Sequence, residues 1–315
     1  MKAIFATPGP WLIDYPRRTR APLALVCAGA LLAILAAPAG ARIIHQERSL
    51  YSTILIDQQG PVMCLQFSVR RDQRNQSCIN KRRPQEMVFV YARMVMTSLL
   101  LNPDPERILI LGLGGGTLPL AFNELLPQAE IDVVEIDPAV VRVAREFFGF
   151  APTEKVDVFA QDGRVFVKRA AHRDENYDLV ILDAFNGEYI PEHLMTREFL
   201  QEVKSLLGHE AVLVANTFSI SDLYDHESAT YADVFGRFFN LRADDTGNRV
   251  IITRNGPLPP REVLEQRADE LQPRVEPYGV DYDRLLGLMN MEVDWDTEAR
   301  VLTDQYSPAN LLRND

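Results

Sequence analysis

Residues 107–119 constrain the fold of this chain more than any other stretch. An unbroken apolar run at 108–111 leads into a turn with glycine at 112, 114, 115 and 116, and a helical pattern follows at 117–126. An apolar run bounded by glycines is typical of a strand buried on both faces, so the stretch predicts a strand, a tight turn and a helix. Glycines let the backbone approach a ligand, and the free N–H groups at the helix start favour electron-rich atoms. The turn therefore predicts a nucleotide or nucleoside site.

The spacing of the glycines narrows the choice of ligand. Gly112, Gly114 and Gly116 form Gly-x-Gly-x-Gly, whereas a dinucleotide fingerprint would need its third glycine at Thr117. About twenty residues further on, the apolar stretch 131–135 ends in Glu135, where a carboxylate can accept both hydroxyls of a ribose. The pattern is closer to the first motif of S-adenosylmethionine-type enzymes than to a NAD site.

Strand-like and helical patterns alternate beyond Glu135. We expect helices at 138–148, 165–171, 196–207 and 221–238, and strands at 156–160, 178–183, 211–216, 241–243 and 250–254. This alternation predicts an α/β fold with a doubly wound, mostly parallel sheet. Ligands of such sheets lie at the carboxyl ends of the strands. The glycine turn, Glu135, Asp162 and Asp183 all fall at those ends.

The flanking regions complete a predicted division into four segments. Stretches 49–57 and 61–69 predict a β-hairpin around the turn 58–60, the polar stretch 72–84 predicts a loop, and 86–101 predicts a helix. We expect a leader at 1–41, an N-terminal β-hairpin subdomain with its connecting helix at 42–101, a nucleoside-binding domain at 102–256, and a C-terminal helical tail at 257–315.

The first 41 residues predict a leader outside the fold. Arg17, Arg18 and Arg20 precede an uncharged stretch at 21–41 that ends in small residues, as in a secretory signal peptide. An uncleaved membrane anchor is the alternative, since the stretch is near the lower limit for crossing a bilayer. Either would leave the protein exported or anchored in the inner membrane. A start site assigned too far upstream would leave it cytoplasmic.

Charge and cysteine content limit the partners. Acidic residues outnumber basic ones 44 to 33, for a net charge of −11, which argues against nucleic acid and is compatible with a small cationic ligand. Cys64 and Cys78 would pair in an oxidising compartment and stay thiols in the cytosol. Their spacing matches no zinc pattern and the five histidines are scattered, so we expect no metal site.

Four motifs in order carry a family resemblance: Gly112-Leu-Gly-Gly-Gly116, Val134-Glu-Ile-Asp137, Gln161-Asp-Gly163 and the stretch from Tyr177 to Asp183. Over roughly residues 49–254 the chain resembles the spermidine synthase family of polyamine aminopropyltransferases. The resemblance implies a Rossmann-like, S-adenosylmethionine-type methyltransferase fold preceded by a small β-hairpin subdomain. It also implies decarboxylated S-adenosylmethionine as co-substrate, a small cationic amine as acceptor, and a homodimer.

Site roles follow from the resemblance position by position. Glu135 would hold the ribose, Asp162 the adenine amine, and Asp183 would lie beside the sulfonium and the aminopropyl arm. The glycines at 112, 114, 116 and 163 would approach the nucleoside, and the turn at 190–191 resembles the family's loop over it. Asp162 has a structural alternative as the N-cap of the following helix.

Three positions depart from the family pattern, and they surround the predicted chemistry. Family members have acidic residues where this chain has Asn186 and Gly115, and a glutamate where it has Arg93. The catalytic candidates are therefore Asp183, Asn186 and Tyr91. Arg93 would repel a cationic acceptor if it faced the cavity, and a solvated helix face is the alternative. Glu188 or Glu192 is a candidate substitute for the missing base.

Two further functions stay open at this point. Because Gly115 lacks the acid that would contact the aminopropyl amine, the chain could instead be a methyltransferase that uses intact S-adenosylmethionine. Because the leader predicts export while adenosyl donors are made in the cytosol, it could also be a non-catalytic exported or membrane-anchored protein that retains the fold.

Overall fold

Two β-sheets organise the chain in the computed structural model, which describes residues 42–69, 72–185 and 190–306. The first sheet is antiparallel and its strands follow chain order: β1 (Arg42–Arg48), β2 (Thr53–Gln59), β3 (Val62–Val69) and β4 (Asp72–Asn80). The second sheet has the order β10-β11-β9-β8-β5-β6-β7. Its strands are β5 (Arg107–Leu111), β6 (Glu130–Glu135), β7 (Val156–Ala160), β8 (Tyr177–Leu182), β9 (Leu207–Phe218), β10 (Phe239–Arg242) and β11 (Asn248–Arg254).

The larger sheet confirms the predicted doubly wound architecture. Strands β5 to β9 pair in parallel, and only β10 and β11 pair antiparallel. The chain order reverses between β5 and β8, so the glycine turn after β5 and Asp183 after β8 emerge side by side. That reversal is where ligands bind in sheets of this kind.

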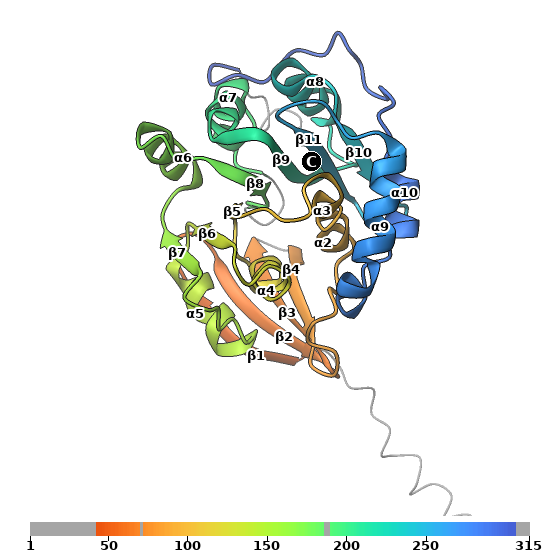
Figure 1. The fold of residues 1–315 in the computed structure, drawn as a ribbon. Helices are drawn as coiled ribbons and strands as arrows, with labels where there is room; N and C mark the ends of the chain where they lie inside the picture. The colour runs from red at the N-terminus through yellow and green to blue at the C-terminus, as the bar shows by residue number, and fades with distance from the viewer. Residues whose placement is uncertain (1–41, 70–71, 186–189, 307–315) are drawn as a thin grey trace, which may run out of the picture. The chain divides into compact units, whose positions relative to one another are not determined.

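Helices cover both faces of the larger sheet, because its central strands are apolar on both sides (Figure 1). Ile108 and Ile110 of β5 pack on one face, and Leu109 and Leu111 pack on the other. The first face is covered by α2 (Val90–Val95), α3 (Ser98–Leu101), α4 (Thr117–Leu125), α9 (Arg261–Val275) and α10 (Tyr282–Leu288). The second is covered by α6 (Gly163–His172), α7 (Arg197–Ser205) and α8 (Tyr224–Phe235). Each fully buried aliphatic side chain contributes about 1.5–3 kcal/mol to this packing.

The small sheet packs on helix α5 (Pro138–Phe147), next to the glycine turn. Ile54, Ile56 and Leu65 from β2 and β3 bury against Val140 and Val143 of α5. Asp137 caps this helix by accepting the N–H of Ala139 at 2.9 Å, as Asp-Pro at a helix start favours. The contact places β3 and β4 along one side of the glycine turn.

Three predictions about the N-terminal region need correction. The predicted hairpin exists as β2 and β3, but two further strands extend it on either side. The predicted loop at 72–84 is wrong, because its first part is strand β4. Most side chains of that strand are polar, so its sequence does not alternate between apolar and polar residues. It is a strand because its backbone pairs with β3. The helix predicted over 86–101 starts only at Val90 and is interrupted between Val95 and Ser98.

Cys64 and Cys78 form a disulfide with an S–S distance of 2.04 Å. They lie directly opposite each other in the β3–β4 register and both are buried. The bond therefore ties β4 to β3 at the residue next to Ser77. Across the described ranges, none of the helices combines the length and apolar character needed to cross a membrane.

Candidate functional site

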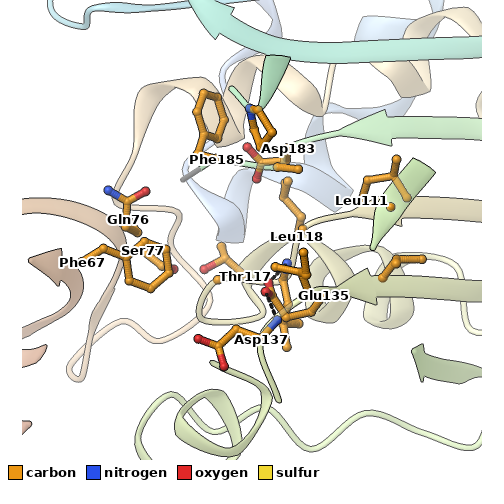
Figure 2. Close-up of a pocket in the computed structure, with 18 of the residues that line it drawn as sticks. Phe67, Gln76, Ser77, Leu111, Thr117, Leu118, Glu135, Asp137, Asp183 and Phe185 are labelled. Carbon is orange, nitrogen blue, oxygen red and sulfur yellow. Dashed lines mark hydrogen bonds between the residues drawn. The ribbon is translucent and has the colours of Figure 1, made fainter. Parts of the chain in front are cut away.

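One cavity opens at the carboxyl ends of β5, β6, β7 and β8, and the glycine turn forms its floor (Figure 2). Glu135 and Asp137 lie toward one end, Asp183 and Phe185 lie at the other, and the small sheet supplies the side between them. The residues that line the cavity include Phe67, Gln76, Ser77, Phe89, Tyr91, Gly112, Leu113, Gly114, Glu135, Asp137, Asp162, Gly163, Asp183, Ala184, Phe185, Pro191 and His193.

Two positions of the turn require glycine because φ is positive and a neighbouring group is too close for a Cβ. Gly112 has φ +104°, and a Cβ there would overlap the carbonyl group of Asp183. Gly116 has φ +84° and is the N-cap of α4, where a Cβ would lie 2.5 Å from the ring of Phe150. Gly112 and Gly114 line the cavity, whereas Gly116 shapes the turn without lining it. The turn thus exposes backbone rather than side chains to a ligand.

Gly115 has no room for the acidic side chain that the family carries there. A Cβ at this position would lie 2.7 Å from Ser77 Oγ and 2.9 Å from Phe148 Cδ1. Ser77 comes from β4, the strand tied to β3 by the disulfide, and it is 6% exposed. Glycine at position 115 is therefore consistent with the close packing of Ser77, from the small sheet, on the turn.

Backbone groups orient the carboxylate of Glu135. Its Oε2 accepts the N–H of Leu113 at 3.1 Å and its Oε1 accepts the N–H of Asp137 at 2.9 Å. Burial raises the pKa of Glu135, and these hydrogen bonds partly oppose the rise. A carboxylate has about four acceptor positions, so Glu135 can accept ligand hydroxyls besides these backbone groups.

Asp162 both caps a helix and lines the cavity. Its Oδ1 accepts the N–H of Val165 at 2.9 Å, which makes it the N-cap of α6. Its Oδ2 lies 3.0 Å from Nε2 of His193, a partner that the sequence did not indicate. The functional and structural interpretations of Asp162 are thus compatible, because one oxygen caps the helix while the other pairs with His193, and both residues line the cavity.

Asp183 is held by two side chains from distant parts of the chain. Tyr91 donates its hydroxyl to Oδ2 at 3.3 Å, and Asn216 donates Nδ2–H to Oδ1 at 2.8 Å. Burial raises the pKa of Asp183 to about 7, although both hydrogen bonds act to lower it. Burial and the nearby Asp183 charge also raise the pKa of Tyr91 well above its usual value, so its hydroxyl remains a donor.

A short amide network supports Asp183 from behind. Asn216 Oδ1 accepts Nδ2–H of Asn248 at 3.0 Å, and Asn248 Oδ1 accepts the hydroxyl of Thr246 at 3.0 Å. This network fixes the amide orientation of Asn216, so its N–H points to Asp183. Sequence reasoning missed Asn216, and the available indication was one amide at the end of an otherwise apolar strand.

Arg93 points away from the cavity. Its Nε donates to the carbonyl of Met87 at 2.8 Å, and its guanidinium lies beside Gly279 in the C-terminal region. Its positive charge therefore does not face the cavity, where it would repel a cationic acceptor. Glu192 begins the 3-10 helix η1 (Glu192–Leu194) and does not line the cavity. Asn186 and Glu188 lie outside the described residues.

The C-terminal segment holds the cavity's rim through Arg164. This side chain pairs with Glu202 at 2.8 Å and with Asp304 at 2.7 Å, and its Nη1 also donates to the carbonyl of His193 at 3.2 Å. Leu302, fully buried, packs against Met195 in the same region. The sequence offered no indication of this clamp, because its members are far apart in the chain.

Within the described ranges, no group of three or more histidine, cysteine, aspartate or glutamate side chains is placed to hold a metal ion. The cavity's polar groups are instead carboxylates, amides, hydroxyls and backbone N–H groups. These are the partners of a hydroxylated and amine-bearing organic ligand.

A doubly wound sheet, a glycine turn and an acid at the end of the next strand define the class of nucleoside-binding α/β proteins. The spermine/spermidine synthase domain family matches residues 88–241. The chain is 49% identical over 274 residues to a polyamine aminopropyltransferase of Vibrio vulnificus, covering 86% of this chain and 91% of that protein. The chain therefore belongs to the spermine/spermidine synthase family, as its motifs predicted.

Solved structures agree with the fold. A probable spermidine synthase from Corynebacterium glutamicum superposes with a TM-score of 0.61 at 22% identity, covering 81% of this chain and 97% of that one. A spermidine synthase in complex with the transition state analogue AdoDATO superposes with a TM-score of 0.58 at 19% identity, covering 79% and 89%. At these identities the likeness establishes the shared fold.

Proposed function

We propose that this chain transfers the aminopropyl group of decarboxylated S-adenosylmethionine to a small polyamine acceptor. The observation that carries the proposal is Asp183, held by Tyr91 and Asn216 in the same cavity as the glycine turn. A relative 49% identical over most of both chains bears the name polyamine aminopropyltransferase, which supports the same reaction.

The reaction asks for positioning and for a proton acceptor. The lone pair of an uncharged amine attacks the methylene carbon beside the sulfonium. A C–N bond forms, the C–S bond breaks, and its electrons leave on sulfur as a neutral thioether. The new ammonium then gives up a proton. A carboxylate whose pKa is about 7 takes that proton more readily than an ordinary aspartate.

We assign the remaining roles on the resemblance and on the geometry that supports it. Glu135 accepts the ribose hydroxyls, and Asp162 accepts the adenine amine beside Gly163. Tyr91 positions Asp183. Asn186, the third catalytic candidate, is assigned by resemblance alone to the position of the family's second acid. Because an amide cannot accept a proton as a carboxylate does, Asp183 acts as the proton acceptor.

Product analysis tests this function. The full-length chain is incubated with decarboxylated S-adenosylmethionine and putrescine, cadaverine or spermidine, and products are measured by mass spectrometry. We expect methylthioadenosine and aminopropylated amine in equal amounts, and much slower formation of both by Asp183→Asn. Formation of S-adenosylhomocysteine and a methylated amine from intact S-adenosylmethionine, with no product from the decarboxylated form, would refute the proposal in favour of methyl transfer.

We propose further that residues 1–41 are a signal peptide or membrane anchor that precedes the three predicted segments 42–101, 102–256 and 257–315. The Cys64–Cys78 disulfide supports an oxidising destination. A reporter active only outside the cytoplasm, fused after residue 315, should be active. An inactive reporter would favour a misassigned start and cytoplasmic placement.

We also propose, by family resemblance, that the protein is a homodimer. Light scattering during size-exclusion chromatography tests this by measuring the mass of the particle in solution.

A further inference from the structure

The hydrogen bonds behind Asp183 all run in one direction. The hydroxyl of Thr246 accepts the backbone N–H of Asn248 at 3.1 Å, and it donates its own proton to Oδ1 of Asn248 at 3.0 Å. Asn248 therefore presents Nδ2–H to Oδ1 of Asn216, at 3.0 Å. Asn216 in turn directs its Nδ2–H to Oδ1 of Asp183, at 2.8 Å. We call Thr246, Asn248 and Asn216 the donor chain.

Backbone contacts fix the turn that carries the first two members of the donor chain. The backbone N–H and the hydroxyl of Ser219, just after β9, donate to the carbonyl of Gly247 at 2.9 and 3.1 Å. Asn248 lies opposite Phe218 in the register of β11 with β9, the strand that also carries Asn216. These contacts use backbone atoms of the turn. Its side chains can therefore be exchanged while the turn keeps these anchors.

The direction of the donor chain matters for the carboxylate at its end. An amide N–H stabilises the charged form of Asp183, whereas an amide oxygen in the same place would repel it. Burial raises the pKa of Asp183 to about 7, and the hydrogen bond from Asn216 acts to lower it. Hydrogen bonds aligned in one chain polarise one another, so the first two donors strengthen the third.

The other titratable groups around Asp183 are independent of the donor chain. Tyr91 of α2 donates to its Oδ2 at 3.3 Å, and the charge of Glu135 at the end of β6 raises its pKa. On β11 and α8, the buried Arg249 and Glu227 pair at 3.1 Å, so their charges offset each other. The remaining titratable groups that line the cavity are Tyr51, Asp137, Asp162 and His193. Substitutions at positions 246 and 248 leave all of these groups in place.

We propose that Thr246 and Asn248 are positioning residues for proton transfer to Asp183. They keep the N–H of Asn216 turned toward this carboxylate and so favour its ionised form. The inference rests on the proposed function, in which Asp183 takes the proton of the new ammonium, and deepens it by naming what sets the pH range of that step. Without the first donor, Asn216 can turn its oxygen to the carboxylate. Asp183 then holds a proton more tightly, and the rate falls at low pH.

Matched substitutions at Thr246 test the first donor. Thr246→Val keeps the shape and removes the hydroxyl, whereas Thr246→Ser keeps the hydroxyl. With the full-length chain and saturating decarboxylated S-adenosylmethionine and putrescine, methylthioadenosine release gives kcat at pH 6 and at pH 9. The loss of one hydrogen bond predicts that kcat of Thr246→Val falls roughly 2- to 12-fold at pH 6 and less than about twofold at pH 9. Thr246→Ser should match the unmodified chain at both, and ionisation of the shared amine affects every variant equally.

The substitution Asn248→Asp should have a larger effect. A carboxylate cannot donate to Asn216, so the amide turns its N–H to the new acid and its oxygen to Asp183. We expect kcat to fall about tenfold or more at pH 6 and to recover to within about threefold at pH 9. The control is Asn176→Asp, which adds the same charge at an exposed position before β8, at the opposite end of that strand from Asp183. It should leave kcat unchanged at both pH values.

A merely structural role for these residues would lower kcat by the same factor at pH 6 and pH 9. That result, or an unchanged pH profile in folded Thr246→Val and Asn248→Asp, would overturn the inference and leave the proposed function intact. Thermal melting identifies the folded variants, and Thr246→Val decides if Asn248→Asp does not fold. No product from the unmodified chain at either pH would overturn the proposed function and the inference with it.

Discussion

The two ends of the cavity are built by different means. At the end proposed to bind the nucleoside, here called the nucleoside end, Glu135 is held by backbone N–H groups of Leu113 and Asp137. At the end proposed to bind the amine, here called the amine end, Asp183 is held by the side chains of Tyr91 and Asn216, which lie 92 and 33 residues away in the sequence. A backbone-held group keeps its orientation when neighbouring side chains change, whereas a side-chain-held group depends on each partner. We therefore expect single side-chain substitutions to change the geometry of the amine end more than that of the nucleoside end.

The substitution Asp183→Asn is the most direct test of the difference between the two ends. The amide keeps the shape but cannot take a proton, so kcat should fall by about 10²–10⁴-fold. Methylthioadenosine affinity, measured by calorimetric titration, should change less than threefold, because Glu135 and the turn are untouched. A large loss of nucleoside affinity would show that the two ends are not separable.

The reciprocal change is Glu135→Gln. Its amide would place an N–H against the backbone N–H of Leu113 or Asp137, and it would weaken the ribose contact. Lost hydrogen bonds to a charged group predict about 1.5–3 kcal/mol, or roughly 10–150-fold weaker methylthioadenosine binding. With saturating nucleoside, kcat should recover to within severalfold of the unmodified chain. A kcat that stays low would contradict a pure binding role.

The substitution Gly115→Asp tests whether packing around Gly115 excludes an acidic side chain. The new side chain would collide with Ser77 Oγ and Phe148, so we expect a loss of about 1–3 kcal/mol in the free energy of unfolding, measured by urea titration. Adding Ser77→Gly should recover part of that loss. No loss in the single variant would mean that the small sheet yields easily at this contact.

The pH dependence sharpens the role of Asp183. Because its pKa is raised to about 7, kcat should rise with pH through about 7 as the proton acceptor ionises. Stability should move the other way. The native pKa lies above the unfolded value of about 3.9, so the native state binds more protons between these pH values. The free energy of unfolding from this group therefore falls as pH rises from about 4 to 7, and Asp183→Asn should lack that component.

The smallest expected effect concerns His193. Its pair with Asp162 is 46% and 30% exposed, so removing it should cost about 0.2–1 kcal/mol. His193→Ala should then weaken methylthioadenosine binding by no more than fivefold, and His172→Ala, at an exposed helix end, should leave it unchanged. A tenfold loss would make His193 part of the adenine contact itself.

The sequence predicted the larger sheet and the nucleoside end because both rest on local patterns. The apolar run at 108–111, the glycines and Glu135 lie within thirty residues, and their contacts are largely backbone contacts. The confirmed fold follows from this regular alternation. Binding and catalytic roles for the individual residues stay predictions, although Gly112, Gly114, Gly163, Glu135, Asp162, Asp183 and Tyr91 all line one cavity.

The rest escaped prediction because it depends on contacts between distant residues. Strand β4 has polar side chains, so nothing in its pattern separates it from a loop, yet it places Ser77 against Gly115. Asn216 meets Asp183 only when β9 pairs with β8, and His193 meets Asp162 only when the segment after β8 packs beside the turn after β7. Spacing alone carries no information on such pairs.

The Arg164 clamp links the cavity to a segment that does not line it. Arg164 and Asp304 are 140 residues apart in the sequence, and Nη1 of Arg164 donates both to Asp304 and to the carbonyl of His193. The position of His193 at the rim therefore depends on a contact between two distant segments. A substitution at Asp304 would change the surroundings of the cavity without altering any residue that lines it.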